Sequence, residues 1–140
     1  MTDKELGYVA GIVDGEGTIG ISYRTNRSGN GSYSLFLAVK MCNQKVVERI
    51  REFTGLGNII HCPSYNNRWR EQWRWQVNGK EAKSILDMLW PLLVEKKEQA
   101  LLAIEFQTRF PQKQGKSVSE EMNNHREMYR LALKELKNRK

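Results

Sequence analysis

Apolar residues recur along the chain at two spacings, and the spacing changes from one segment to the next. A spacing of three or four residues predicts helices over about 3–14, 44–54, 79–89, 91–110 and 118–140. Alternation of apolar and polar residues predicts strands over about 18–26, 32–41, 58–62 and 68–77. Two pairs of strands set between helices predict an α+β fold, with an antiparallel sheet and its helices on one face.

Residues that cap helices stand at the expected helix ends. Thr2 with Glu5, and Asn78 with Glu81, have the spacing of capping boxes. Pro91 is expected to open the long fourth helix. Further caps are expected at Asn43, Gly55 and Ser117.

Each predicted strand has an apolar face and a polar face. The apolar faces carry Ile19, Ile21, Tyr23, Leu35, Leu37, Val39, Trp73, Trp75 and Val77. At this alternating spacing, Trp73 and Trp75 are expected to be core residues rather than stacking platforms for bases. The polar faces are rich in Ser, Thr, Asn, Gln and Arg, and Arg and Gln bond bidentately to guanine and adenine edges. A solvent-facing sheet has a similar composition, so the residue types alone leave both interpretations open.

The first helix carries two stripes of residues. Leu6, Val9 and Val13 form an apolar stripe at helical spacing. Small residues, with one acid, form the second stripe: Gly7, Ala10, Gly11 and Asp14. A glycine costs a helix about 1 kcal/mol relative to alanine. Two glycines in one short helix therefore indicate close approach of another backbone.

Composition narrows the class of protein. The 140 residues fit one domain, and 39% hydrophobic content with four Trp excludes a disordered tail. A net charge of +7 favours a polyanionic partner without choosing between DNA, RNA and anionic lipid. Cys42 and Cys62 form no Cys-x-x-Cys pair, which argues against a disulfide framework or a zinc site. No apolar run has membrane-spanning length, so no membrane partner is expected.

One segment has a more specific pattern. Residues Val9 to Gly17 read VAGIVDGEG and resemble the LAGLIDADG signature position by position, with Gly15 and Glu16 in place of Ala and Asp. The turn 55–57 and the Pro-apolar-apolar segment 91–97 resemble the same family. The resemblance covers about residues 6–103 and points to the LAGLIDADG homing endonucleases, whose signature requires small residues, apolar residues and two acids in fixed order.

The resemblance implies an αββαββα core over 1–112, with a saddle-shaped sheet whose polar face lies in the DNA major groove. A single motif implies a homodimer, with the stripe Gly7, Ala10, Gly11 and Asp14 at its interface. Residues 113–140 are expected to form a basic C-terminal helix that packs on or extends the core. The implied activity is site-specific cleavage of double-stranded DNA at a long pseudo-palindromic target, with a role in intron or intein mobility.

The resemblance also implies roles for individual residues. Glu16 matches the metal-binding and catalytic acid, and the Gly15 carbonyl is the second expected metal ligand. Lys96 matches the basic residue near the scissile phosphate, and Lys45 matches a second one more loosely. Asp14 is expected to be structural at the helix end. The expected metal is Mg²⁺, with Mn²⁺ as a substitute and Ca²⁺ supporting binding without cleavage.

DNA contacts are expected along the polar strand faces. The residues named for this role are Ser22, Arg24, Asn26, Lys40, Arg68, Arg70, Gln72, Arg74 and Gln76. One position departs from the family, because Met41 stands where relatives often hold a polar residue that orders water. Lys40, Asn43 or Gln44 are alternatives for that role.

Two other functions fit the resemblance: an RNA maturase that binds intron RNA during splicing, and a DNA-binding relative that does not cleave. Intact Glu16 and Lys96 favour a nuclease over the second of these. The N-terminus has no secretory pattern, so the expected location is the cytoplasm of a prokaryote or phage-infected cell, or the matrix or stroma of an organelle that encodes the gene.

Overall fold

The computed structural model describes residues 1–25, 31–65, 70–111 and 120–138. Its helices are α1 (Asp3–Glu16), α2 (Gln44–Thr54), α3 (Gly79–Leu89), a 3-10 helix η1 (Trp90–Leu92), α4 (Lys97–Arg109) and α5 (Glu120–Asn138). Its strands are β1 (Gly17–Thr25), β2 (Gly31–Met41), β3 (Asn58–Cys62) and β4 (Gln72–Asn78). The order of these elements confirms the αββαββα core and the α+β class. No helix within the described ranges is long and apolar enough to cross a membrane.

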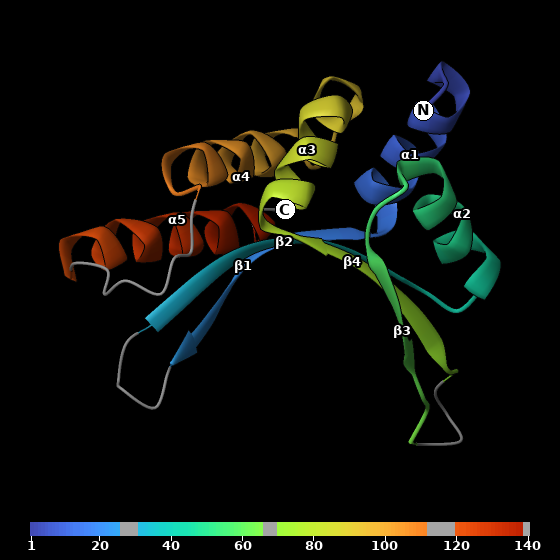
Figure 1. Ribbon diagram of the computed structural model, residues 1–140, viewed down its shortest axis with the longest axis horizontal. Coiled ribbons are helices and arrows are strands. Elements are labelled where there is room, and N and C mark those ends of the chain that lie inside the picture. Colours follow the sequence, from blue (N-terminus) through green and yellow to red (C-terminus); the bar gives the residue numbers. More distant parts are fainter. Residues whose placement is uncertain (26–30, 66–69, 112–119, 139–140) are drawn as a thin grey trace.

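All four strands form one antiparallel sheet, in the order β1-β2-β4-β3. Figure 1 shows this sheet as an arch, with the helices on its convex side and the two strand pairs reaching down at opposite ends. The register places Ile19 opposite Leu37 and Leu37 opposite Val77. Because side chains alternate across a strand, these three residues face the helices, and their neighbours in sequence face the open concave side.

The core lies between the sheet and the helices, and Trp75 is its largest fully buried side chain. The indole Nε1 of Trp75 donates a hydrogen bond of 2.9 Å to the Leu56 carbonyl. Gly57 has a φ of 96° and lies so close to this indole that a Cβ there would collide with it. Trp75 is therefore a core residue, as the alternation predicts, and Trp73 is half-buried beside the His61 ring.

The first helix begins as the sequence predicts. Thr2 Oγ1 accepts a hydrogen bond from the Glu5 amide at 3.1 Å, and Glu5 Oε1 accepts one from the Thr2 amide at 2.9 Å. The helix continues to Glu16, two residues beyond the predicted end, and β1 starts directly afterwards at Gly17. The strand thus follows the helix without a loop.

Two predicted caps also form. Asn43 Oδ1 accepts a hydrogen bond from the Lys45 amide, and Gly55 ends α2 with a φ of 69°. Asn78 occupies the position before α3 as predicted, but its side chain forms no capping hydrogen bond, because Asn78 Oδ1 accepts a hydrogen bond from Gln76 on the sheet instead. Ser117 lies outside the described residues.

The prediction that a long helix begins at Pro91 is wrong. Pro91 lies in the short helix η1, and α4 begins only at Lys97. Between them the chain is extended at Leu93, which is buried, and the amides of Val94 and Lys96 bind the Asp14 carboxylate. These long-range contacts replace the helical hydrogen bonds that local sequence favours.

Two smaller differences concern the strands. The fourth strand begins at Gln72 rather than near Arg68, so Arg70 precedes it. Tyr23 is 46% exposed although it alternates with core residues, because it lies near the outer end of β1, where its ring packs on Tyr33.

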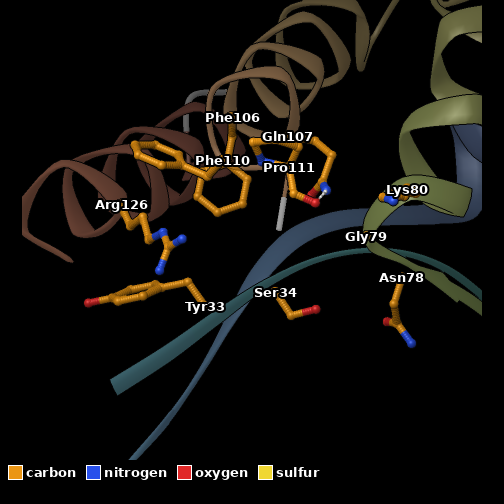
Figure 2. Close-up of a pocket in the computed structure, with 10 residues that line it drawn as sticks. All are labelled: Tyr33, Ser34, Asn78, Gly79, Lys80, Phe106, Gln107, Phe110, Pro111 and Arg126. Carbon is orange, nitrogen blue, oxygen red and sulfur yellow. Dashed lines mark hydrogen bonds between the residues drawn. The ribbon is translucent and has the colours of Figure 1, made fainter. Parts of the chain in front are cut away.

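The C-terminal helix α5 packs on α4 and on the edge strand β1. Figure 2 shows the guanidinium of Arg126 between the rings of Phe110 and Tyr33, at one end of a cavity of about 300 Å³. Tyr33 also donates a 2.6 Å hydrogen bond to Glu127, which binds Arg130. Burial and this carboxylate raise the pKa of the Tyr33 hydroxyl to about 12. The basic C-terminal helix is thus fixed to the sheet by both ring contacts and hydrogen bonds.

Candidate functional site

The end of α1 presents an exposed acid that has no partner among the described residues. Glu16 is the last residue of the helix, and both Glu16 and Gly15 are exposed. No hydrogen bond or ion pair joins the Glu16 carboxylate to another described residue. The Gly15 carbonyl lies in the last helical turn, where carbonyl groups lack an amide four residues ahead in the helix. Both groups are free to bind a ligand.

Asp14, two residues earlier, binds the segment before α4. Its carboxylate accepts hydrogen bonds from the Val94 amide at 3.2 Å and from the Lys96 amide at 3.0 Å. The ammonium of Lys96 returns to the helix and donates a 2.7 Å hydrogen bond to the Asp14 carbonyl. These contacts agree with a structural role for Asp14, and they place Lys96 Nζ at the helix end that carries Glu16.

The electrostatics of Asp14 follow from the same contacts. Partial burial opposes ionisation, but the amides of Lys96, Glu95 and Val94 and the nearby Lys96 ammonium outweigh it and lower the pKa of the Asp14 carboxyl. Asp14 is therefore a carboxylate at neutral pH that is already saturated with donors. Glu16 is the acid that remains available.

The oxygen groups at this helix end fit a hard divalent cation. Carboxylate and carbonyl oxygens are the ligands that Mg²⁺ and Ca²⁺ prefer, and Mg²⁺ usually keeps several waters. The described part of the chain contains no group of three or more His, Cys, Asp or Glu residues that could enclose a metal by itself. A metal at Glu16 therefore needs further oxygens from a second molecule, from DNA or from water.

The residues near the end of β2 lie on different faces of the sheet. Met41 pairs with Trp73 and packs against the core, so its thioether faces the helices. Lys40 pairs with Arg74 and is exposed on the concave face. Asn43 caps α2, and Lys45 is exposed in its first turn, without a hydrogen bond or ion pair to Glu16 or Lys96 among the described residues. Of the three alternatives to Met41, which are Lys40, Asn43 and Gln44, Lys40 is the one that lies on the concave face of the sheet.

The concave face of the sheet carries most of the predicted recognition residues. Ser22 and Arg24 on β1 and Gln72, Arg74 and Gln76 on β4 all lie on this face. Asn26 and Arg68 lie outside the described residues. Arg70, just before β4, lines a cavity of about 540 Å³ with Lys40 and Gln72. No Asp or Glu is among the described strand residues on this face, so its charge is positive.

A chain of side-chain hydrogen bonds runs along β4. Arg74 Nε donates to Gln76 Oε1 at 2.8 Å, and Gln76 Nε2 donates to Asn78 Oδ1 at 2.8 Å. The guanidinium of Arg74 also lies 5.7 Å from the centre of the Phe36 ring. These contacts fix the direction of each polar group before any partner arrives.

The predicted interface stripe on α1 is only partly exposed. Gly7, Gly11 and Gly15 are exposed, and a Cβ at any of them would meet no atom within 4 Å. Ala10 is 2% exposed and packs in the protein's own core, so its assignment to an interface with a second copy is wrong. The open stripe therefore consists of glycines spaced four residues apart.

Comparisons with known proteins now bear on this geometry. No family model and no curated protein matches the sequence. The homing endonuclease I-CvuI, solved with DNA, matches with a TM-score of 0.79 at 17% identity, over 98% of this chain and 84% of that one. The archaeal intron-encoded homing endonuclease I-Vdi141I, complexed with DNA, matches with a TM-score of 0.79 at 18% identity, over 97% and 86%. The LAGLIDADG homing endonuclease I-GzeII, in complex with its DNA target, matches with a TM-score of 0.65 at 16% identity, over 91% and 43%.

The chain has the LAGLIDADG homing endonuclease fold. Within this fold, the concave face also holds Ser34, Asn78 and Ile60, which the sequence did not predict as DNA contacts. Ile60 pairs with Arg74 and is 52% exposed. Ile60 is apolar, but alternation within 58–62 places it on the other face of the strand from Ile59.

We expect Asp14→Asn to lower the free energy of unfolding by about 1–3 kcal/mol, because the amides of Val94 and Lys96 lose a charged acceptor. Urea denaturation measures this difference. Since folding lowers the pKa of Asp14, the stabilising effect of its carboxylate is complete above the ordinary Asp pKa of 3.8 and is lost as pH falls through the lower pKa of the folded protein. The difference in free energy of unfolding between wild type and variant should therefore disappear at acidic pH. Equal stability at neutral pH would contradict the structural role, and Asp3→Asn, at an exposed position, is the control.

Proposed function

We propose that this protein is a site-specific endonuclease that cuts double-stranded DNA as a homodimer with a divalent metal. The observation that carries this proposal is the bonding of Lys96 to Asp14, which brings an ammonium group to the helix end that presents Glu16. An acid free for a metal and a cation for a phosphate then share one location. Both lie beside a positively charged concave sheet.

Recognition would use the concave face. The described strands on this face supply Ser, Thr, Asn, Gln, Arg and Lys without a carboxylate, and a β-ribbon fits the major groove. Arg74 supports this role because its Nε is held by Gln76, while no described residue forms a hydrogen bond with the terminal nitrogens of its guanidinium. A guanidinium held in this way is suited to a bidentate contact with guanine.

Cleavage would take place at the end of α1. A bound Mg²⁺ supplies Lewis-acid stabilisation of the phosphate and acidifies a bound water. In this chain, the Glu16 carboxylate and the Gly15 carbonyl would hold the ion. Lys96 would stabilise negative charge on the phosphate, because an ammonium has three donors and only one is used by the Asp14 carbonyl.

A homodimer follows from the need to cut two strands with one Glu16 per chain. The glycine stripe of α1 is open, and Leu92 and Val94, beside the end of that helix, are 49% and 86% exposed. Exposed apolar residues next to a helix face made of glycines suit close packing with a second α1. We expect cleavage with Mg²⁺ or Mn²⁺, and binding without cleavage in Ca²⁺.

The first test is Glu16→Gln. We expect cleavage of a target selected from a randomised DNA library to fall by about a hundredfold to a thousandfold, because the amide is a poor ligand for Mg²⁺. Affinity for the same DNA in Ca²⁺ and the helical signal in circular dichroism should change little. Glu98→Gln, in the exposed first turn of α4, is the control. Undiminished cleavage by Glu16→Gln would remove this residue from the metal site.

The second test is Gly11→Arg. Because a Cβ at Gly11 meets nothing within 4 Å, the monomer should fold and gain about 1 kcal/mol of helix stability. The dimer should be lost, which sedimentation equilibrium at low micromolar concentration detects, and cleavage should be lost with it. Asn124→Arg, exposed on α5, should remain dimeric. A dimeric Gly11→Arg would contradict the proposed interface.

The third test is Arg74→Ala. If Arg74 reads a base, the variant should lose about 1–3 kcal/mol of discrimination at particular positions of the target. Binding selection on a target library, compared with Arg51→Ala on the exposed side of α2, measures this loss. Weakening that is uniform across all sequences would instead assign Arg74 to a phosphate contact.

A further inference from the structure

The end of α5 carries a lysine to the concave side of the sheet. Gly20 and Phe36 are direct partners in the sheet and lie on this side, because the core residues Ile19 and Leu37 alternate with them. A Cβ at Gly20 would lie 3.1 Å from Lys137 Nζ. The same ammonium is 5.9 Å from the centre of the Phe36 ring. Lys137 therefore reaches around the edge strand β1 to the concave side.

Helical geometry explains how Lys137 arrives there. Lys137 follows Leu133 by four residues and Arg126 by eleven, so all three lie on the same side of α5. Leu133 is 1% exposed and Arg126 is 7% exposed, which identifies this side as the packed one. Lys134, by contrast, is exposed. Figure 2 shows Arg126 held between Phe110 and Tyr33, which fixes the helix that positions Lys137.

The surroundings of Lys137 contain cations and no described acid partner. Lys137 is half-buried, and burial together with the nearby Lys96 ammonium lowers the pKa of its amine. Arg74 lies over the same Phe36 ring as Lys137, at 5.7 Å from its centre. No ion pair joins Lys137 to another residue in the described part of the chain. Lys96 and Arg74 thus lie near Lys137, which has no carboxylate partner among the described residues, and a partly buried cation is costly unless an anion joins it.

We propose that Lys137 is a second phosphate-binding cation at the cleavage centre, where it and Lys96 together hold the DNA backbone at the position of cutting. This inference rests on the proposed endonuclease function. It extends the site to a helix outside residues 6–103, the part of the sequence that carries the motif resemblance. Gly20 contributes by leaving room for the ammonium and for the Phe36 ring on which it lies.

Packing alone does not account for this lysine. An ammonium 5.9 Å from a ring centre is at the outer limit of cation–π attraction. A purely structural residue at this place would gain by being apolar, and methionine has a similar length without the charge. We therefore expect Lys137→Met to be at least as stable as the wild type in urea.

The test compares Lys137→Met with Lys134→Met in the full-length protein, on a target selected from a randomised DNA library. For Lys137→Met we expect single-turnover cleavage in Mg²⁺ to fall by about a hundredfold. In Ca²⁺, the slope of log affinity against log salt should become shallower by about one per protomer, because one phosphate contact is lost. Lys134→Met should match the wild type in both measurements, and Lys137→Arg should keep the wild-type salt slope.

Two results would overturn the proposal, and they are distinguishable from failure of the proposed function. If the wild type cuts and Lys137→Met cuts equally well with an unchanged salt slope, Lys137 holds no phosphate. If Lys137→Met loses stability while its salt slope is unchanged, the residue is structural. If the wild type cuts no DNA under these conditions, the endonuclease function itself is wrong, and this inference is wrong with it.

Discussion

The hydrogen bonds between the Asp14 carboxylate and the backbone before α4 connect the parts of this molecule that matter for its chemistry. They join the end of the first helix to a segment about eighty residues later in the chain. They interrupt the helix that Pro91 would otherwise open, and they turn Lys96 back toward the helix end. Without them, Glu16 and Lys96 would have no fixed relation. Asp14, whose carboxylate binds backbone amides, thus organises a site in which Glu16, two residues later, is the free acid.

The sheet provides the second requirement, because it separates an apolar side from a polar one. Trp75 and the other residues on its face of the sheet are covered by the helices, while Arg74 and Gln76 lie on the opposite, open face. Hydrogen bonds from Arg74 to Gln76 and from Gln76 to Asn78 orient this face in advance. A preoriented face loses less conformational entropy when it binds.

The C-terminal helix links these two features. Its packed side is anchored at Arg126 and Leu133 and ends at Lys137, which reaches the concave side near Lys96. A helix that the motif does not include therefore contributes charge to the proposed cleavage centre. In this arrangement the site is assembled from α1, the segment before α4, the sheet and α5, which are dispersed along the sequence.

The sequence alone determined the features that depend on neighbouring residues. Helical and alternating periodicity located the helices and strands, the cap of α1 formed at Thr2 as its spacing predicted, and the nine-residue motif identified the fold and singled out Glu16. Tertiary structure decided the rest. It delayed the start of the fourth helix to Lys97, placed Met41 against the core with Lys40 on the open face, and buried Ala10 within the protein. It also brought Lys137 to the concave side. Local pattern does not encode any of these outcomes, because each depends on contacts between residues far apart in the chain.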